Sequence, residues 1–567
     1  MAQDETTATD SLLKEMSHWT GIAGQMQQLM MEHGAASLLK MGDDGAALSA
    51  TPASGAEAML AAQAAWWQET LSVWRGMIPT APGEAAAQWQ QPIFDMIRQT
   101  YEAIAGQVLA GVERVEGIDA RQKEQLLFMT RSAIEAMSPA NFAFTNPRVV
   151  EKIVETGGRN LVTGLERMLA DISRGQLTHT SADAFEIGRN IATTPGKVVK
   201  ETPLYQLIHY APTTPKVLAT PLLIFPPWIN RFYILDLRPE KSFVRWALDQ
   251  GLSVFMVSWK SADASMADVL MDDYVLAGEH DAIETVRDLL GVPGVHVIGY
   301  CVAGTALAML LAWLAANDKA GTVASATFFT AQVDFSEAGD LALFVDDAQL
   351  GVLGTLATDG YIDGRYMAAT FNLLRGRDLI WNYVVNNYLL ANDYAPFDLL
   401  HWNSDVTNLP AEWHRRYLAD LYRDNLLVKP GAMTVGGVPI DLTRVTTPAY
   451  IQAGREDHIA PPQSVWKMTQ HLTGPMRFVL AGSGHIAGVI NPPAANKYGY
   501  WTNDARLSTL DEFIAGATEH KGSWWPDWMA WIAARSGGTV AAKGARIPGK
   551  GKLKAIEDAP GRYVRMR

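Results

Sequence analysis

The chain has 567 residues, a formal net charge of −13, 48% hydrophobic and 19% charged residues, and a single cysteine. This length suits roughly two to four domains, and the composition is that of a globular protein rather than a disordered one. One cysteine excludes an intrachain disulfide and any metal site built from several thiolates. The acidic balance, without an extended basic stripe, argues against nucleic acid as a partner.

The first residues are acidic and are not followed by an apolar stretch, so we expect no secretory signal and a reducing, cytoplasmic location. The longest apolar run, residues 302–316, is too short to cross a bilayer and is predicted to be a buried helix. The chain lacks a phosphate-binding G-x-x-x-x-G-K-[ST] loop and an H-E-x-x-H motif. We therefore expect no transmembrane segment, no metal and no bound cofactor.

Residues 1–195 are predicted to form a mostly helical N-terminal domain. Apolar residues follow helical spacing in segments 12–31, 56–77 and 93–115. Tryptophan and methionine are frequent in this part of the chain. This pattern fits either a bundle that buries its own aromatic side chains or a surface for a subunit, a partner or an apolar phase.

Residues 196–567 are predicted to form an α/β domain, because short apolar runs alternate there with helical stretches. The alternation indicates a mostly parallel sheet with helices on both faces. The predicted strands are 218–225, 253–258, 295–298, 323–329, 449–453 and 476–480, and the predicted helices are 241–250, 272–290 and 302–317.

Two segments of this domain do not follow the alternation. A long stretch at about 335–445 is rich in Trp, Tyr and Asn, and we interpret it as a cap over an active site. The tail, about 535–567, is basic and rich in glycine, and we interpret it as a solvated segment.

The only cysteine lies between a predicted strand and a predicted helix, in Gly299-Tyr300-Cys301-Val302-Ala303. This is the pattern of the G-x-S-x-G nucleophile elbow, with Cys in place of Ser and Ala303 at the last small position. A nucleophile on a sharp turn needs slim residues two positions away on either side, because strand and helix would otherwise clash. The turn also places Cys301 at a helix N-terminus, where the backbone dipole favours a thiolate. A buried structural cysteine fits this motif alone equally well.

Two further loops favour a catalytic role. Asp457 follows the strand predicted at 449–453, and His485 follows the strand predicted at 476–480. Both residues therefore lie beyond the carboxyl ends of their strands, where open α/β sheets place their sites. The chain order of Cys301, Asp457 and His485 is the nucleophile, acid and base order of α/β-hydrolases, and it predicts a catalytic triad.

Neighbouring residues offer alternatives to this triad. His458 adjoins Asp457, but adjacent side chains seldom face each other productively, so we interpret His458 as a substrate contact. Glu456 competes with Asp457 as the acid, although the Gly-x-x-Asp spacing favours Asp457. His296 falls inside a predicted buried strand and is expected to be a core histidine.

Acyl transfer also needs an oxyanion hole. One donor is expected from the backbone N–H of Val302, the residue after the nucleophile. The second donor is expected from the loop after the first core strand, Pro226-Pro227-Trp228-Ile229-Asn230. The prolines have no N–H, and among the other three residues we favour Ile229.

The sequence resembles the polyhydroxyalkanoate synthases, and it looks most like their class I, the poly(3-hydroxybutyrate) polymerases. The similarity runs from about Pro203 to the C-terminus and, more loosely, through the N-terminal part. One departure is Ala303, where many members have Gly. The resemblance is carried by segments 226–230, 233–236, 299–304, 381–383, 397–400, 454–458, 484–493 and 522–528, and by the ending 559–564.

The resemblance implies an α/β-hydrolase core in which Cys301 carries the acyl group, His485 is the base and Asp457 is its partner. It also implies a cap that gates substrate entry, a homodimer as the active form, and residence at the surface of polymer granules. The implied substrates are an (R)-3-hydroxyacyl-coenzyme A and the growing polyester chain, so coenzyme A is a leaving group and not a cofactor. We add Trp228 as a candidate wall of the acyl pocket, and Arg375 as a candidate ligand for coenzyme A phosphates.

Two other functions stay open. A cysteine-dependent hydrolase of the thioesterase or dienelactone-hydrolase type would use the same triad. A non-catalytic granule-coating protein would use its Trp-rich helices and would not need Cys301.

Overall fold

The computed structural model describes residues 89–357 and 359–566, which fall into two compact units. We call them the helical unit, which ends at Thr178 and includes Arg375–Tyr394, and the α/β unit, His179–Leu374 with Ala395–Arg567. The helical segments predicted at 12–31 and 56–77 lie outside the described residues.

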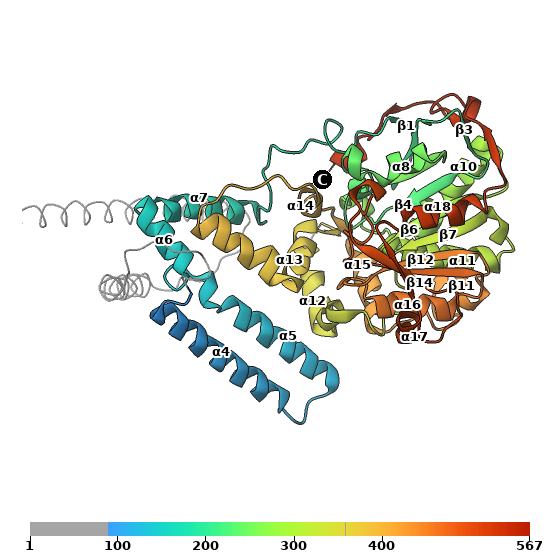
Figure 1. Cartoon of the computed structure of the whole chain (residues 1–567). Coiled ribbons are helices and arrows are strands. Elements are labelled where there is room, and N and C mark those ends of the chain that lie inside the picture. Colours follow the sequence, from blue (N-terminus) through green and yellow to red (C-terminus); the bar gives the residue numbers. More distant parts are fainter. Residues whose placement is uncertain (1–88, 358, 567) are drawn as a thin grey trace, which may run out of the picture. The chain divides into compact units, whose positions relative to one another are not determined.

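The helical unit begins with an antiparallel pair of helices, α4 (Pro92–Glu113) and α5 (Ala120–Ala136) (Figure 1). The first of these confirms the helix predicted over 93–115. Asp119 caps α5 by accepting a hydrogen bond from the N–H of Gln122. The unit continues with α6 (Pro147–Thr156), α7 (Arg159–Arg174) and two short π-helices, η8 (Arg377–Trp381) and η9 (Val384–Leu389).

Residues 375–394 were expected in the cap, but they pack on α7 within the helical unit. Asn160 Nδ2 donates a hydrogen bond of 2.6 Å to the carbonyl of Leu389. Gly164 has no room for a Cβ atom, because the carbonyl of Tyr388 occupies that position. The expected cap is therefore divided between the two units, since contacts distant in sequence, rather than chain order, decide where this segment lies.

The boundary after Thr178 also differs from the expected one at 195. Ile191 and Ala192 are fully buried in the core of the α/β unit. The N–H of Ala192 donates to the carbonyls of Asp236 and Leu237. These contacts attach residues 179–195 to the α/β unit.

An eleven-stranded sheet forms the centre of the α/β unit, in the order β15-β14-β13-β12-β7-β6-β4-β5-β2-β1-β17. The neighbouring strands from β13 to β5 pair in parallel, whereas the strands toward both edges pair antiparallel. The strands are β1 (Gly196–Glu201), β2 (Tyr205–Tyr210), β4 (Leu222–Phe225), β5 (Val254–Trp259), β6 (Val295–Tyr300), β7 (Val323–Phe329), β12 (Ala449–Gly454), β13 (Met476–Ala481), β14 (Gly499–Thr502), β15 (Thr518–Lys521) and β17 (Glu557–Asp558).

The predicted strands are all present, and the sheet confirms the α/β class. The segment predicted as one strand at 218–225 contains the end of β3 (Lys216–Leu218) and the whole of β4. The other helices of this unit are α8 (Phe243–Asp249), α9 (Met271–Asp273), α10 (Asp281–Leu290), α11 (Val302–Ala316), α12 (Asp347–Leu356), α13 (Gly364–Leu374), α14 (Asp398–Ser404), α15 (Ala411–Arg416), α16 (Pro462–His471), α17 (Leu510–Ala515) and α18 (Trp525–Ala533).

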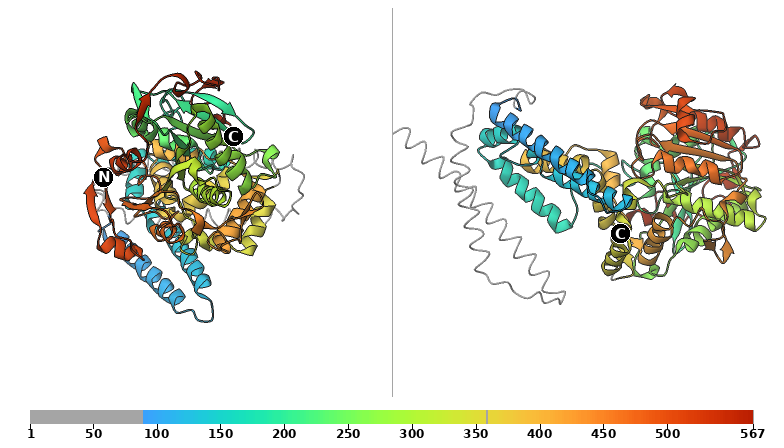
Figure 2. Two further views of the ribbon diagram at one scale, coloured as in Figure 1. Left: turned by 90° about the vertical axis from the view of Figure 1, so that its right-hand side faces the viewer. Right: turned by 90° about the horizontal axis from the view of Figure 1, so that it is seen from below.

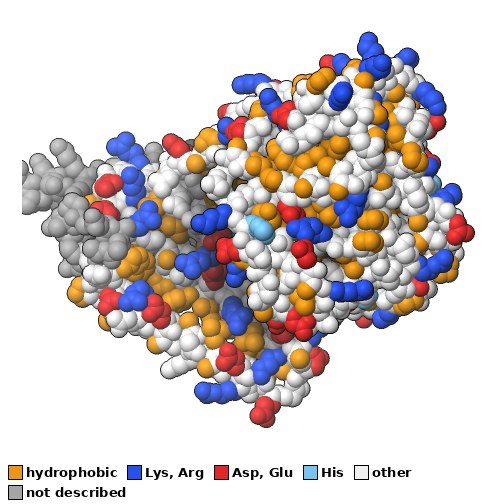
Figure 3. Space-filling model, turned by 45° about the vertical axis from the view of Figure 1, so that its right-hand side comes forward, with side chains coloured by type: hydrophobic (Ala, Val, Ile, Leu, Met, Phe, Trp, Pro, Cys, Tyr) orange, Lys and Arg blue, Asp and Glu red, His pale blue; other side chains and the backbone are white. Residues whose placement is uncertain are grey.

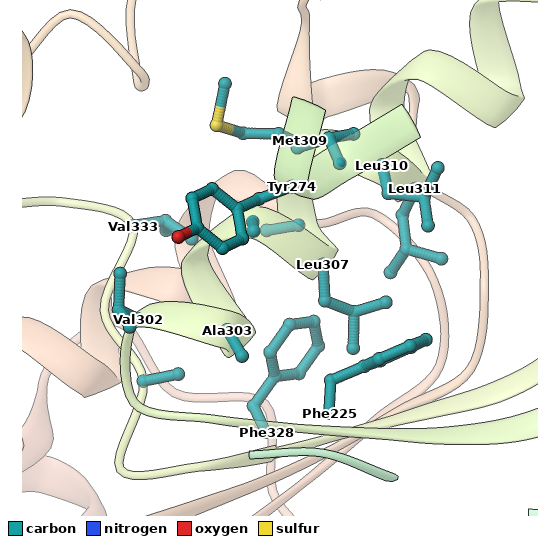
Figure 4. Packing of buried hydrophobic residues seen from close by; sticks show 14 of the residues in the cluster. Phe225, Tyr274, Val302, Ala303, Leu307, Met309, Leu310, Leu311, Phe328 and Val333 are labelled. Atoms are coloured by element: carbon teal, nitrogen blue, oxygen red, sulfur yellow. The ribbon is translucent and has the colours of Figure 1, made fainter. Parts of the chain in front are cut away.

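Two hydrophobic cores lie on the two faces of the sheet, because successive strand residues point to opposite sides. Leu223 and Phe225 join the core that includes α10, α11 and α16, whereas Leu222 and Ile224 join the core that includes α8 and α18. Figure 4 shows Leu307 of α11 above Phe225 and Phe328 of the strands. Nearly every residue of α11 is buried, as predicted.

No helix in the described part of the chain is both long and apolar enough to span a membrane. On the face shown in Figure 3, Lys and Arg side chains are interspersed with Asp and Glu, without a continuous basic stripe among the described residues.

The tail after Arg535 is paired with strands and is not a free segment, which corrects our expectation, although many of its side chains are exposed. Residues Thr539–Ala541 (β16) pair with β3, and β17 pairs with β1 at the edge of the sheet. The buried Arg546 donates to the carbonyls of Leu218 and Ala219. The tail, in red in Figure 2, runs over the outside of the α/β unit. Its composition resembles that of a solvated segment, but its backbone satisfies open edges of the sheet.

Candidate active site

Cys301 stands on a strained turn between β6 and α11. Its φ of 55° and ψ of −126° lie in a region that residues with a side chain rarely adopt. The Cys301 N–H donates to the carbonyl of Phe329 at 2.9 Å. Its own carbonyl accepts from the N–H groups of Gly304 and Thr305, which start the helix. The turn therefore holds the thiol at the carboxyl end of the parallel strands.

Small residues allow β6 and α11 to approach each other. A Cβ atom at Gly299 would lie 2.6 Å from the Cα of Gly304, and a Cβ atom at Gly304 would lie 2.3 Å from the Cβ of Ala331. The sequence motif drew attention to Ala303 as the second slim position. The structure shows that Gly304 is the residue whose Cα faces Gly299, and that Ala303 is buried beside it.

His485 and Asp457 lie next to each other in the loops after β13 and β12. The distance from His485 Nδ1 to Asp457 Oδ2 is 2.7 Å, and both residues are buried. Asp457 Oδ1 accepts hydrogen bonds from the N–H groups of Ile459 (2.8 Å) and Ala460 (2.9 Å). The carboxylate is thus fixed on both oxygens and orients the imidazole ring.

The electrostatic surroundings of His485 favour its charged form. Burial opposes that charge, but the negative charges of Asp457 and Cys301, together with hydrogen bonds to both side chains, raise the pKa of His485 to about 10. The structure therefore places His485 beside both of the other predicted triad residues, Asp457 and Cys301.

Tyr300, which sequence reasoning did not single out, supports the loop that carries His485. Its hydroxyl donates a hydrogen bond of 3.0 Å to the His485 carbonyl, and the two ring centroids are 5.7 Å apart. Burial raises the pKa of Tyr300 well above its usual value, so it stays a hydroxyl donor. In the sequence, the feature that could have identified Tyr300 was its position directly before Cys301.

The predicted oxyanion donors are backbone groups on two elements. Val302 opens α11, and Ile229 lies in the loop after β4. Within the described part of the chain, neither of these N–H groups donates a hydrogen bond to another protein group. Both are therefore available to a ligand.

Trp228 lies inside an aromatic cluster and is 2% exposed. Its ring stacks on Tyr274 at a centroid distance of 4.0 Å and meets Trp259 and Trp413 edge to face, each at 5.4 Å. Its role as a wall of the acyl pocket stays a prediction.

Two tyrosines of the interrupting segment, both in η10 (Tyr417–Arg423), belong to this site. Tyr417 and Tyr422 are buried, and beyond the effect of burial the charge of Cys301 raises the pKa of both phenols. Gln332 Nε2 donates to the Tyr422 hydroxyl at 3.2 Å. The aromatic content of the segment was visible in the sequence, but nothing in it distinguished these two residues from the others.

The remaining candidates lie outside this group. His458 is half-buried in the loop after β12, and the neighbouring Glu456 is exposed. Arg375 belongs to the helical unit, where it forms an ion pair of 2.6 Å with Asp378. Roles for His458 and Arg375 in substrate binding stay predictions. The buried His296 is bonded to Ser325 and Ser536, which confirms it as a core residue.

Comparison with known proteins agrees with the geometry. Residues 84–247 match the family described as the poly-beta-hydroxybutyrate polymerase (PhaC) N-terminus, and residues 247–492 match the alpha/beta hydrolase fold. The chain is 46% identical over 455 residues to the poly(3-hydroxyalkanoate) polymerase subunit PhaC of Cupriavidus necator, covering 79% of this chain and 77% of that one. It is 43% identical over 519 residues to the poly(3-hydroxyalkanoate) polymerase of Methylorubrum extorquens, covering 89% and 85%. The chain therefore belongs to the poly(3-hydroxyalkanoate) polymerase family and is an acyltransferase with an α/β-hydrolase fold.

Proposed function

We propose that this protein polymerises (R)-3-hydroxyacyl-coenzyme A, with 3-hydroxybutyryl-coenzyme A as the expected substrate, into a polyhydroxyalkanoate and releases coenzyme A. The observation that carries the proposal is the contact of His485 with both Cys301 and Asp457 at the elbow of a chain from this family. The names of the relatives support the polyester product.

In the first step, Cys301 forms a covalent thioester. Asp457 occupies Nδ1 of His485, which leaves Nε2 to take the proton of the thiol. The Cys301 thiolate attacks the carbonyl carbon of the substrate thioester, and the N–H groups of Val302 and Ile229 stabilise the resulting oxyanion. Collapse of the tetrahedral intermediate breaks the bond to the coenzyme A sulfur, which leaves with the proton from His485.

In the second step, the attacking group is a hydroxyl instead of the Cys301 thiol. His485 removes the proton from the 3-hydroxyl of another unit, whose oxygen attacks the Cys301 thioester and forms an ester while the thiol is regenerated. Transfer between two thioesters is nearly isoenergetic, so the acyl group on Cys301 stays activated for this step. That is a physical reason for a cysteine, rather than a serine, at the elbow.

Exclusion of water separates a polymerase from a thioesterase. Three buried aromatic side chains of the interrupting segment, Trp413, Tyr417 and Tyr422, pack in one cluster. The charge of Cys301 contributes to the raised pKa of both tyrosines. A dry, aromatic surrounding disfavours water as the acceptor of the acyl group. We therefore prefer polymerisation over hydrolysis at this site.

We also propose that the enzyme acts as a cytoplasmic homodimer at the surface of polymer granules. The support is the resemblance of its motifs to those of polyhydroxyalkanoate synthases. Because each chain has one cysteine, an elongation step that uses two thiols would require two subunits to share a site.

The deciding experiment follows both products of (R)-3-hydroxybutyryl-coenzyme A. We expect the wild-type protein to release coenzyme A and to form an insoluble polyester, and Cys301→Ala to lower both rates at least about a thousandfold. Thermal unfolding of the variant serves as the folding control. Release of coenzyme A with only soluble 3-hydroxybutyrate would indicate a thioesterase. Undiminished polymer formation by Cys301→Ala would refute the role of the thiol.

A further inference from the structure

The loop that carries Ile229 is held by segments from distant parts of the chain. Trp259 Nε1 donates to the carbonyl of Pro226 at 2.7 Å, which fixes the beginning of the loop to β5. Thr407 Oγ1 donates to the carbonyl of Trp228 at 2.6 Å, and Trp402 Nε1 donates to the carbonyl of Arg231 at 2.7 Å. The carbonyls of Trp228 and Arg231, on either side of Ile229 and Asn230, are thus tied to α14 and to the segment between α14 and β9 (Leu409–Pro410).

Arg231, at the end of this loop, binds the C-terminal end of the chain. The residue is 2% exposed, and its guanidinium donates to the carbonyls of Tyr563 (3.3 Å) and Met566 (2.6 Å). Its Nε lies 3.5 Å from Asp405 Oδ1, and the other oxygen of Asp405 accepts from the Tyr233 hydroxyl at 2.9 Å. A buried guanidinium is stable only when its charge and its donors are matched, and one carboxylate with two carbonyls provides that match.

The C-terminal end is itself anchored in the α/β unit. Tyr563 and Val564 are buried. The N–H of Tyr563 donates to Gln206 Oε1 at 3.1 Å, and the Tyr563 hydroxyl donates to the carbonyl of Thr202 at 2.7 Å. The carbonyls that Arg231 binds are therefore presented by a fixed segment and not by a loose end.

We propose that Arg231 is a positioning residue for acyl transfer and that residues 563–566 complete its site. By fixing Arg231, the C-terminal end sets the position of the Ile229 N–H two residues earlier in the loop. This inference rests on the proposed function, because it assumes that Ile229 donates to the oxyanion. A displaced donor stabilises the oxyanion of the transition state less well, whereas the binding of the substrate changes little. The rate of acylation should therefore fall with little change in KM.

Two variants and one control test the proposal. Arg231→Lys keeps the positive charge but loses the planar fork that reaches all three partners. Truncation after Arg565 removes the Met566 carbonyl and keeps the buried Tyr563 and Val564, together with the Arg565 side chain that donates to the carbonyls of Gly561 and Ile187. The control is Arg562→Ala, whose exposed side chain pairs with Glu201 and Glu557 outside the contact with Arg231.

The measurement is the rate of Cys301 acylation by (R)-3-hydroxybutyryl-coenzyme A, followed by rapid quench and intact-protein mass spectrometry. We expect Arg231→Lys and the truncation each to lower the acylation rate constant by about tenfold to a hundredfold, with KM within about twofold of wild type. The double variant should be no slower than the worse single variant, because both act through one contact. Arg562→Ala should acylate at the wild-type rate.

Three outcomes separate this inference from the proposed function. Acylation of wild-type Cys301 without polymer formation would overturn only the polymerisation. Equal acylation rate constants in wild type and Arg231→Lys, or a reduced fraction of reactive sites at an unchanged rate constant, would overturn only the positioning role. A wild-type protein that is not acylated at all would overturn both. Alkylation of Cys301 by iodoacetamide, which needs no oxyanion hole, should proceed equally in all forms that keep the fold.

Discussion

His485 interacts with both Asp457 and Cys301, and these two residues set its protonation state. Asp457 accepts from Nδ1 and is itself held by two backbone N–H groups, which leaves Nε2 as the ring nitrogen for Cys301. With the pKa of His485 raised to about 10 by Asp457 and Cys301 against the effect of burial, the imidazolium persists at neutral pH. We therefore expect His485 to hold the proton that it takes from the Cys301 thiol until the coenzyme A sulfur leaves.

The contact of Asp457 with His485 predicts that Asp457 matters more for elongation than for acylation. In Asp457→Asn, His485 can still take the proton of the thiol, which is more acidic than a hydroxyl, and we expect single-turnover acylation to fall about tenfold. Deprotonating a hydroxyl needs a stronger base, so the elongation rate should fall at least about a hundredfold. His485→Gln should abolish both steps. Rapid-quench acylation and steady-state release of coenzyme A measure the two effects, and an equal loss in both would contradict this division.

At the scale of elements, the elbow formed by β6 and α11 requires glycine at two positions. Gly304→Ala would place a methyl group 2.3 Å from Ala331 Cβ and 2.9 Å from the Gly299 carbonyl. The helix would have to move away from the strand, so we expect a loss of about 1–3 kcal/mol in the free energy of unfolding and slower acylation of the displaced Cys301. Urea denaturation and the acylation rate measure the two effects. Ala303→Gly is the matched control, with an expected cost of about 1 kcal/mol or less. A Gly304→Ala variant as stable and as active as wild type would show that this contact is not required.

The elbow also shows how far sequence patterns reach. The strand, the turn and the helix around Cys301 were predictable because a short apolar run, a slim residue and a helical stretch follow one another within a few residues. The role of Gly304 was not predictable from the sequence, because it depends on a contact with Ala331, which lies in the loop after the next strand. Motif spacing describes neighbours along the chain, whereas this contact joins two elements.

Contacts between distant segments explain the other differences. The pairing of the tail with β1 and β3 satisfies open strand edges, which the Gly-rich and Lys-rich composition of the tail does not reveal. The interrupting segment was expected to act as one cap, yet residues 375–394 pack on α7. Asp457 and His485 were predictable because loops after parallel strands meet at one edge of a sheet. Tyr417 and Tyr422 reach the site, and Arg231 binds the C-terminal end, through tertiary packing, for which the sequence has no local pattern.

At the scale of the whole molecule, buried histidines link the stability of the α/β unit to pH. His209, His296 and His414 are buried, and burial, with a smaller contribution from a nearby arginine for the first two, lowers their pKa values to about 3, 4 and 4. These rings are neutral in the folded protein but titrate near 6.5 when the chain unfolds. The unfolded state therefore binds more protons below pH 6.5, and stability must fall as the pH decreases from that value toward 4.

We predict that acidification from pH 7 to pH 5 lowers the free energy of unfolding by about 2 kcal/mol for each of these histidines. His485 offsets less than about 1 kcal/mol of the loss, because its raised folded-state pKa gives a contribution that is present below pH 6.5 and is lost as the pH rises from 6.5 toward 10. Urea denaturation followed by tryptophan fluorescence at a series of pH values measures the slope. In His296→Gln the amide can still bond Ser325 and Ser536 without titrating, so the loss between pH 7 and pH 5 should shrink by about 2 kcal/mol. Equal stability of the wild-type protein at pH 7 and pH 5, or an unchanged loss in His296→Gln, would show that these rings are not neutral in the folded state.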